Sequence, residues 1–184
     1  MNRAVLLLTG LLPLSACNSE PEVDARNASV QEVAEEVRDA TRDAVNIRPG
    51  KWLSQVTLEE VTAPGVPAQV REQMQGMFAG KQSYESCLTA EDVKRPKEDF
   101  FAGKDNKQCR YDHFRMGDGK IDARMRCSHE QMSQIMEFAG TYSPEAYQMR
   151  MSTKTEAAAG PASGMSMRMR VDAKRVGECD GKQA

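Results

Sequence analysis

The stretch from Cys109 to Cys127 constrains the fold more than any other part of this chain. Two runs of alternating charged and apolar residues meet at Gly117-Asp118-Gly119, and a cysteine stands at the outer end of each run. Alternating runs around a short Gly-containing turn are typical of a β-hairpin. Because Cys109 and Cys127 lie symmetrically about Asp118, a hairpin closed by a three-residue loop would bring them together, and we predict a disulfide between them.

The first residues resemble a bacterial lipoprotein signal. Asn2-Arg3 supplies a positive charge, and residues 4–14 form an apolar segment that is too short to span a bilayer. The tetrapeptide Leu14-Ser15-Ala16-Cys17 resembles the lipobox at which a dedicated signal peptidase cuts before the cysteine. We therefore expect a lipoprotein signal peptide over residues 1–16 and a Cys17 that carries acyl chains such as palmitate. An ordinary secretory signal with a chance cysteine is the alternative.

Lipidation would place the chain in the bacterial cell envelope. Each buried methylene contributes about 0.8 kcal/mol, so one acyl chain holds a protein only marginally and two or more hold it stably. Asn18 follows the cysteine in place of Asp, which resembles enterobacterial lipoproteins that are sorted to the outer membrane. We expect a lipid anchor on the periplasmic face of the envelope, in the outer membrane, without a spanning segment.

Length and charge bound the domain organisation. A chain of 184 residues with 40% hydrophobic residues is long enough for one domain with a core. The formal net charge of −2 becomes −3 when Arg3 is removed with the signal peptide. Such a chain lacks the basic footprint of a nucleic-acid-binding protein, so we expect no nucleic acid partner.

Four cysteines remain if Cys17 is lipidated. An even number of cysteines in an exported chain predicts disulfides, because the periplasm is oxidising. With Cys109 and Cys127 paired by the hairpin, Cys87 and Cys179 are left to form the second disulfide. A metal site made of the four cysteines is the alternative, but no C-x-x-C spacing supports it.

The segment before the domain is expected to be a linker followed by a helix. Residues 17–28 are polar and predict a flexible tether. Ser29 and Glu32 form a capping box, which predicts an amphipathic helix over residues 29–46. Its apolar stripe is narrow and made of Val and Ala, so we expect a loosely docked spacer. A partner-binding or coiled-coil helix is the alternative.

Residues 48–180 predict a β-rich, disulfide-bonded domain. Apolar and polar residues alternate over about residues 51–61, 82–88, 147–155 and 165–176, as well as in the hairpin. Residues 128–142 fit a helix or a strand, and we favour the strand. The expected fold is mainly β: an antiparallel meander of about seven strands in a curled sheet or half-barrel, with the N-terminal helix and one or two short helices.

Several of these elements resemble a known family. They are Arg48-Pro49-Gly50-Lys51-Trp52, Cys87-Leu88-Thr89-Ala90-Glu91-Asp92, the Cys109 to Cys127 hairpin, the Met-x-Met strands and Arg175-Val176-Gly177-Glu178-Cys179. Their order is similar to that in the DUF3617 family of exported bacterial proteins of unknown function. The resemblance implies a compact, β-rich periplasmic domain with four paired cysteines, and it supports the strand for residues 132–142. It implies no catalytic residues.

The high methionine content allows several interpretations of one face of the sheet. The chain has 12 Met and only 5 Phe, and Met149, Met151, Met165, Met167 and Met169 recur with a period of two. We favour core packing, because Met fills irregular gaps and this period is typical of a core-facing strand. The alternatives are a groove for an apolar ligand and a Cu(I) site made of thioethers. Exposed methionines would also scavenge oxidants.

The sequence contains no recognisable catalytic constellation. His113 and His129 are the only histidines, and neither a G-x-S-x-G nor an S-x-x-K motif is present. A turn explains Gly117-Asp118-Gly119 without a calcium site. We therefore expect a non-enzymatic lipoprotein without a cofactor, which binds an apolar molecule or another envelope component. A Cu(I)-binding, metal-handling protein is the alternative, and an enzyme is the least favoured class.

Overall fold

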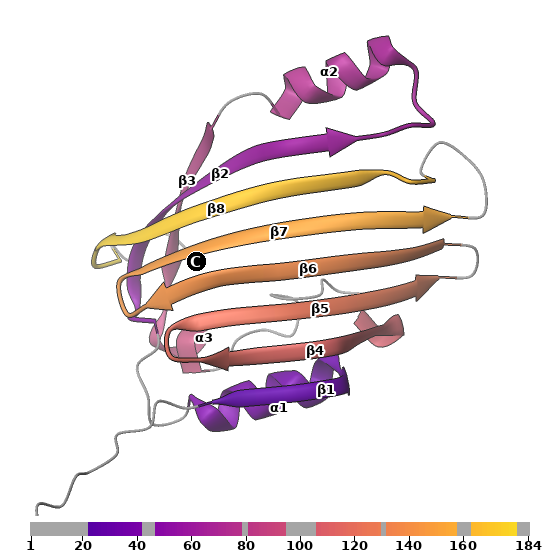
Figure 1. The fold of residues 1–184 in the computed structure, drawn as a ribbon. Coiled ribbons are helices and arrows are strands. Elements are labelled where there is room, and N and C mark those ends of the chain that lie inside the picture. Colours follow the sequence, from indigo (N-terminus) through magenta and orange to yellow (C-terminus); the bar gives the residue numbers. More distant parts are fainter. Residues whose placement is uncertain are drawn as a thin grey trace, which may run out of the picture.

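The computed structural model describes residues 22–41, 47–78, 81–94, 106–129, 132–157 and 163–179. Eight antiparallel strands form one open sheet in the order β1-β4-β5-β6-β7-β8-β2-β3 (Figure 1). The strands are β1 Val23–Ser29, β2 Gly50–Thr62, β3 Lys81–Leu88, β4 Cys109–Gly117, β5 Lys120–His129, β6 Met132–Ser143, β7 Ala146–Ala157 and β8 Ser166–Gly177. The helices are α1 Val30–Ala40, α2 Ala68–Phe78, α3 Ala90–Lys94 and the 3-10 turn η1 Asn106–Gln108.

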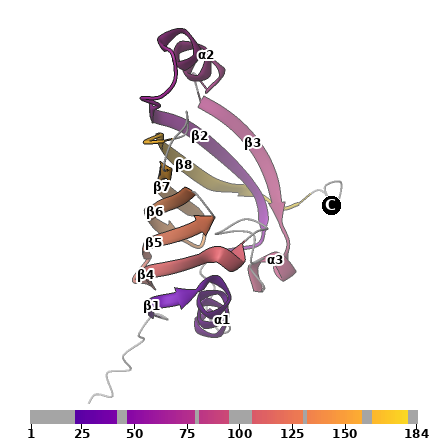
Figure 2. The same ribbon diagram turned by 90° about the vertical axis from the view of Figure 1, so that its right-hand side faces the viewer.

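The mainly β class and the meander are confirmed. Consecutive hairpins join β4 to β8, and β8 then pairs with β2, which pairs with β3 at the far edge. The sheet curls without closing, and α1 lies on its concave side next to β1 (Figure 2). The ambiguous segment is a strand, because β6 pairs along its whole length with both β5 and β7. The expected one or two short helices are also present, as α2 after β2 and α3 after β3.

The predicted flexible tether over residues 17–28 is wrong from Val23 onward. Residues 23–29 form β1, an edge strand that pairs with β4 and that brings the strand number to eight instead of about seven. Val23, Ala25 and Ala28 are buried in the core. The strand was missed because its apolar residues are few and small, and because Asn27, with a φ of 47°, interrupts the period. Residues 17–21 lie outside the described residues.

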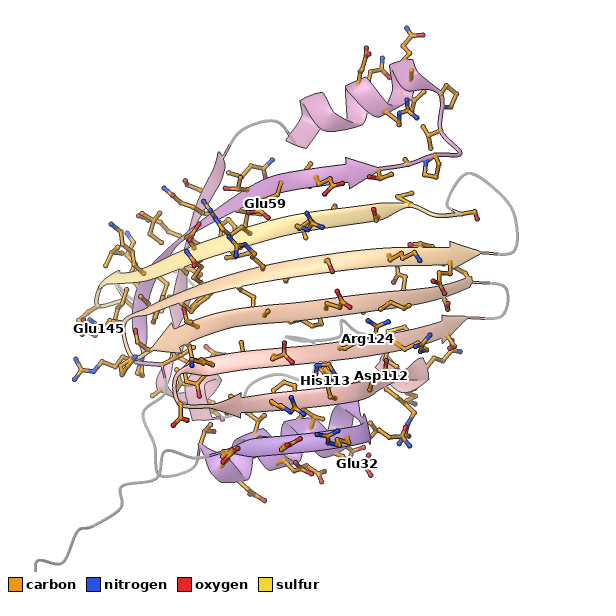
Figure 3. All side chains as sticks on the ribbon, viewed as in Figure 1. Glu32, Glu59, Asp112, His113, Arg124 and Glu145 are labelled. Carbon is orange, nitrogen blue, oxygen red and sulfur yellow. A yellow bond between two sulfur atoms is a disulfide. The ribbon has the colours of Figure 1, made fainter. Side chains whose placement is uncertain are left out.

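The predicted N-terminal helix is present, and its capping box is confirmed. The backbone amide of Ser29 donates to Glu32 Oε2 at 2.6 Å, and the amide of Glu32 donates to Ser29 Oγ at 3.2 Å (Figure 3). The hydrogen bond from the Ser29 backbone amide and, after it, a hydrogen bond with the Ser29 side chain lower the pKa of the Glu32 carboxyl. The helix ends at Ala40, earlier than the predicted residue 46, and residues 42–46 lie outside the described part of the chain.

The expectation that this helix docks loosely is wrong. Val30, Val33 and Val37 are buried in one cluster with Tyr111 and Phe114 and with the apolar residues of β1. The small side chains let the helix approach the sheet edge closely. Phe114 and Met125 at the centre of this cluster are 0% exposed, and burial raises the pKa of Tyr111 far above its ordinary value. The packed domain therefore begins at Val23 and not at residue 48.

Both disulfides have the predicted pairing. Cys109 and Cys127 are directly opposite in the β4–β5 ladder, with a Cα–Cα distance of 4.0 Å. The turn itself is a two-residue loop in which Asp118 and Gly119 both have positive φ, instead of the predicted three-residue loop. A bulge between Tyr111 and His113 adds one residue to β4, and this shift brings the two cysteines into register.

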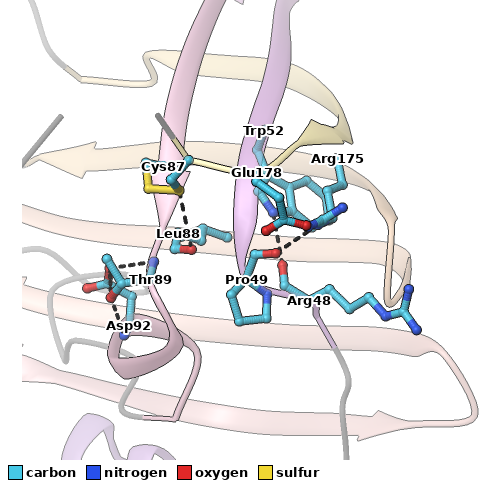
Figure 4. Close-up of a disulfide and its surroundings, with 10 residues drawn as sticks. Arg48, Pro49, Trp52, Cys87, Leu88, Thr89, Asp92, Arg175 and Glu178 are labelled. Carbon is cyan, nitrogen blue, oxygen red and sulfur yellow. Dashed lines mark hydrogen bonds and ion pairs between the residues drawn. A yellow bond between two sulfur atoms is a disulfide. The ribbon is translucent and has the colours of Figure 1, made fainter. Parts of the chain in front are cut away.

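The second disulfide is part of a clasp that holds the start of β2 and the end of β3 to the end of β8 (Figure 4). It joins Cys87 to Cys179, which are 92 residues apart in sequence. Beside it, Arg175 Nε donates to the carbonyl of Pro49 at 2.7 Å, and the Arg175 guanidinium also pairs with Glu178. Trp52 Nε1 donates to the Arg48 carbonyl at 3.1 Å.

Gly50 is required at the centre of this clasp. Its φ of 139° lies in a region that L side chains rarely adopt. A Cβ at this position would lie 2.5 Å from the Gly177 carbonyl oxygen and 2.6 Å from Arg175 Nε. The close approach lets β2 and β8 pair at their ends, so this glycine fixes the register of the two strands.

Replacing Val33 by Ala should destabilise the whole domain if α1 is part of the core. Val33 is 1% exposed, so we expect the free energy of unfolding to fall by about 1 to 3 kcal/mol. The exposed Glu36→Ala on the same helix is the control and should change this free energy by less than about 0.5 kcal/mol. Urea unfolding measures both, and equal small effects would mean that the helix is only a spacer.

Replacing Gly50 by Ala should lower the free energy of unfolding by at least about 2 kcal/mol, because strain at φ and the clash with Gly177 and Arg175 add together. Gly76→Ala is the matched control, since a Cβ there has no atom within 4 Å and the position is inside α2. It should raise this free energy by about 0.5 to 1 kcal/mol. Denaturant titration with the disulfides intact measures the free energy of unfolding of both variants. If Gly50→Ala leaves this free energy unchanged, Gly50 is not required in the clasp.

Candidate functional site

The concave side of the sheet carries the methionines that the sequence analysis selected. Cross-strand register places alternate residues of β6, β7, β8 and β2 on this side, continuous with the core beneath α1. We call this surface the Met-lined face. Its residues are Met136, Phe138, Gly140 and Tyr142 of β6, Tyr147, Met149, Met151 and Thr153 of β7, Met167, Met169, Val171 and Ala173 of β8, and Trp52, Ser54, Val56 and Leu58 of β2.

The structure brings four of the five predicted methionines together. Met151 lies directly opposite Met169, and Met149 and Met167 occupy neighbouring positions on the same two strands. All four are half-buried. Met165 immediately precedes β8, and its carbonyl accepts a hydrogen bond from the Thr155 amide at 2.8 Å. The Met side chains therefore form one continuous surface across the middle of the sheet.

The exposure of the methionines on this surface increases from the part under α1 to the part formed by β7 and β8. Under α1, Met125 is 0% exposed and Met116 is 8% exposed, as expected for a closed core. Met136, Phe138, Tyr142 and Met149 pack against that cluster and are only partly buried. Core packing, the favoured interpretation, thus describes the half of the face near β4 and β5 better than the half formed by β7 and β8.

The Met-lined face is almost without charge. Among the described side chains at the alternating positions on this side of β5, β6, β7, β8 and β2, Arg175 alone carries a charge. Its guanidinium is engaged by the Pro49 carbonyl and by Glu178 in the clasp. A ligand on this face would therefore meet thioether, aliphatic and aromatic groups, and ionic recognition would be confined to one end of the strands.

Gly140 keeps the centre of the face shallow. A Cβ on this residue would lie 2.2 Å from the Gln148 carbonyl oxygen and 3.0 Å from the Met149 sulfur. Met149 is directly opposite Gly140 in the β6–β7 ladder. The missing side chain lets the flexible Met149 lie across the neighbouring strand, so this part of the surface can adapt its shape.

Aromatic side chains gather at one end of the Met-lined face, which sequence reasoning did not single out. Tyr142, Tyr147 and Tyr84 fall in one row across the sheet, and Trp52 lies in the next row. The Trp52 and Tyr147 ring centroids are 5.7 Å apart. Tyr84 is 51% exposed. Its partial burial and, as a smaller cause, the nearby phenol of Tyr147 raise the pKa of Tyr84. These tyrosines are far apart in sequence, so only the sheet order reveals the row.

The convex side of the sheet is covered by ion pairs. Arg124 pairs with Asp112 at 3.1 Å and with Glu137 on the next strand, and His113 Nε2 lies 2.8 Å from Asp122 Oδ1 (Figure 3). Arg168 pairs with Glu60 at 2.9 Å. The His129 side chain lies outside the described residues. Across the described ranges, no three His, Cys, Asp or Glu side chains gather as metal ligands would.

Two hollows lie at the end of the sheet that contains the hairpin turn. One of about 600 Å³ is mostly on the convex side and is lined by Leu53, Gln55, Thr141, Tyr142, Ser143, Ala146, Tyr147, Gln148, Asp172, Ala173 and Lys174. Another of about 320 Å³ lies beside the turn and the start of β1. Neither is lined by Met149, Met151, Met167 or Met169. In the part of the chain that the structure describes, no helix has the length and apolar character needed to cross a membrane.

Comparisons with known proteins give a family but no characterised relative. No curated protein and no solved structure matches the chain significantly. A sequence model of the family described as "Protein of unknown function (DUF3617)" matches residues 47–179. The match begins just before the clasp residues Arg48 to Trp52 and ends at Cys179, so β1 and α1 lie outside it. On this match, which covers most of its length, the chain belongs to the DUF3617 family, whose function is unknown.

Proposed function

We propose that this chain is a lipid-anchored, non-enzymatic binding module of the bacterial cell envelope, and that its Met-lined face binds an apolar ligand or an apolar part of an envelope component. The observation that carries the proposal is the combination of half-burial and neutrality on that face. Met149, Met151, Met167 and Met169 are half-buried and adjacent, and no charged group stands among them.

The physical argument compares the two halves of the concave side. Under α1, apolar side chains are closed off from water, and this half needs no ligand to be stable. Across β7 and β8, Val171 and Ala173 are buried as well, but Met149, Met151, Met167 and Met169 keep part of their surface accessible. Covering this methionine surface would contribute about 25 cal/mol per Å². Met is suited to such a role, because its unbranched thioether adapts to ligands of different shape.

The envelope location rests on the N-terminal sequence. Leu14-Ser15-Ala16-Cys17 supports cleavage before Cys17 and its lipidation, and Asn18 supports sorting to the outer membrane. Two disulfides within one domain fit an oxidising compartment such as the periplasm. The proposed protein is therefore held on the periplasmic face of the membrane by lipid alone.

A non-enzymatic role agrees with the positions of the polar groups. The one histidine whose side chain is described, His113, is paired with Asp122 on the convex side, away from the Met-lined face. The cysteines other than Cys17 are consumed in disulfides and offer no thiolate nucleophile. The polar residues of the concave rows are Ser, Thr, Gln and Tyr, without an adjacent base.

The proposal predicts that a fluorescent fatty acid binds the mature chain and that Met151→Glu weakens binding at least about tenfold, because a carboxylate would be buried against the ligand. Ala139→Glu is the matched control, since it adds the same charge on the convex side, opposite Arg150, and should leave affinity unchanged. The measurement is a fluorescence titration of mature Cys17→Ser chain exported behind a cleavable leader. Absence of binding, or equal binding by both variants, would contradict the proposal.

The arrangement of Met151 and Met169 favours a second candidate, a Cu(I) site. Directly opposite residues of antiparallel strands have Cα atoms about 4.5 to 5.5 Å apart, so two thioethers of this pair can share one soft metal ion. Met149 and Met167, next along the same strands, supply further sulfur atoms. Thioethers select Cu(I) over harder ions.

This candidate predicts stoichiometric Cu(I) binding in equilibrium dialysis, with loss of the metal in Met167→Leu combined with Met169→Leu. Leu keeps the apolar volume and removes the sulfur, so fatty acid binding should survive in the same variant. Met116→Leu, in the closed core beneath α1, is the control and should retain the metal. Failure of the unaltered chain to hold Cu(I) would eliminate this candidate and leave the apolar ligand.

A further inference from the structure

The position of β1 limits how the domain can lie on a membrane. Val23, the first residue of β1, pairs with Met116, next to the β4–β5 turn. Val23 is the sixth residue after Cys17, and six extended residues span at most about 20 Å. If Cys17 is lipidated, as the proposed function requires, the start of β1 and the β4–β5 turn beside it are held within about 20 Å of the bilayer.

The register shows which elements share that end, which we call the hairpin end. Lys120 is opposite Thr141, and Ala146 is opposite Lys174, so the β4–β5 and β6–β7 turns lie together. The start of β2 and the last residues of β8 meet at the same end in the clasp (Figure 1). Strands of 12 residues such as β6 are about 40 Å long, so the other end of the sheet is far from the anchor.

The hairpin end has the chemistry of a membrane interface. The aromatic row of Tyr142, Tyr147 and Tyr84, with Trp52 beside it, lies at this end of the Met-lined face. Tyrosine is enriched where hydrocarbon meets headgroups, because an apolar ring and a polar tip suit both sides. Trp52 is 1% exposed and its Nε1 donates to the Arg48 carbonyl, so the tyrosines are the aromatic groups that can face lipid. Arg48, whose side chain is 58% exposed, lies at the same end and can contact phosphate, although it also pairs with Glu145.

Apolar residues continue from the aromatic row toward the other end. From Tyr142 to Met136 the β6 strand extends six residues, which is about 20 Å. One leaflet of the hydrocarbon core is about 15 Å thick, so this surface is long enough for an acyl chain. Along the strands the order is therefore the Arg48 cation, the aromatic row and the methionines. These groups match, in the same order, the phosphate, the glycerol region and the acyl chain of a phospholipid.

We propose that the hairpin end lies on the membrane surface and that a membrane phospholipid occupies the Met-lined face, with its acyl chain along the methionines and its headgroup at the aromatic row. This inference deepens the proposed function and depends on it. The short connection from Cys17 to Val23 keeps β1 and the β4–β5 turn close to the lipid. The absence of charge among the methionines allows the acyl chain to enter without burying an ion.

Trp52 provides the test, since it is the only tryptophan and lies at the hairpin end. The full chain, with acylation of Cys17 confirmed by mass spectrometry, is inserted into vesicles of phosphatidylethanolamine and phosphatidylglycerol. These vesicles carry phospholipid with a quencher close to the glycerol or at the end of the acyl chain. Trp52 is 1% exposed, so iodide in the buffer should not quench it, whereas the glycerol-proximal label should reduce its emission.

Met151→Glu should lose this quenching, and Ala139→Glu should keep it. The result for the unaltered chain does not depend on whether a variant folds. If Cys17 is acylated and neither label quenches Trp52, the inference is overturned. If the fatty acid still binds the Cys17→Ser chain, the proposed function survives that result and only the phospholipid and its orientation are rejected. The inference would also be overturned if Cys17 carries no lipid, because nothing would then keep the start of β1 close to a membrane.

Discussion

Pairing of β2 with β8 is the interaction on which the rest of the structure depends. It joins β2, the first strand of the region matched by the family, to β8, the last strand, and so adds β2 and β3 to the same curled sheet as the β4–β8 meander. Gly50 allows the two backbones to approach, Arg175 binds the Pro49 carbonyl, and Cys87–Cys179 locks the neighbouring edge. Several of the residues that resemble the family, Arg48 to Trp52, Cys87 and Arg175 to Cys179, therefore hold this junction.

Once the sheet is curled, its two sides acquire different chemistry. Convex positions are exposed and carry cross-strand ion pairs such as Arg124 with Asp112, each of which contributes about 0 to 1 kcal/mol. Such pairs keep the sheet soluble and oppose slippage, because a shift of one residue would put charge on the concave side. The described residues of the concave side are almost all uncharged and rich in methionine, so the proposed ligand would use the same kind of apolar surface that stabilises the core.

The N-terminal addition outside the family match covers part of this concave apolar surface. β1 extends the sheet, and α1 covers the apolar residues of β1 and β4 with Val30, Val33 and Val37. This half of the concave side is thereby closed, and the half across β7 and β8 keeps part of its surface accessible. The same addition fixes where a lipid anchor would attach, since β1 starts next to the hairpin turn.

Period-two alternation, cysteine number and the capping box predict most of the strands, both disulfides and the Ser29 cap, because these signals are local or countable. It is the tertiary structure that makes residues 23–29 a strand and α1 a part of the core, since a few small side chains among charges become apolar surface only when β4 lies beside them. It also decided the bulge at Asp112, the aromatic row and the half-open state of Met151 and Met169. These features depend on strand order and curvature, which are contacts between residues distant in sequence and leave no periodic trace in it.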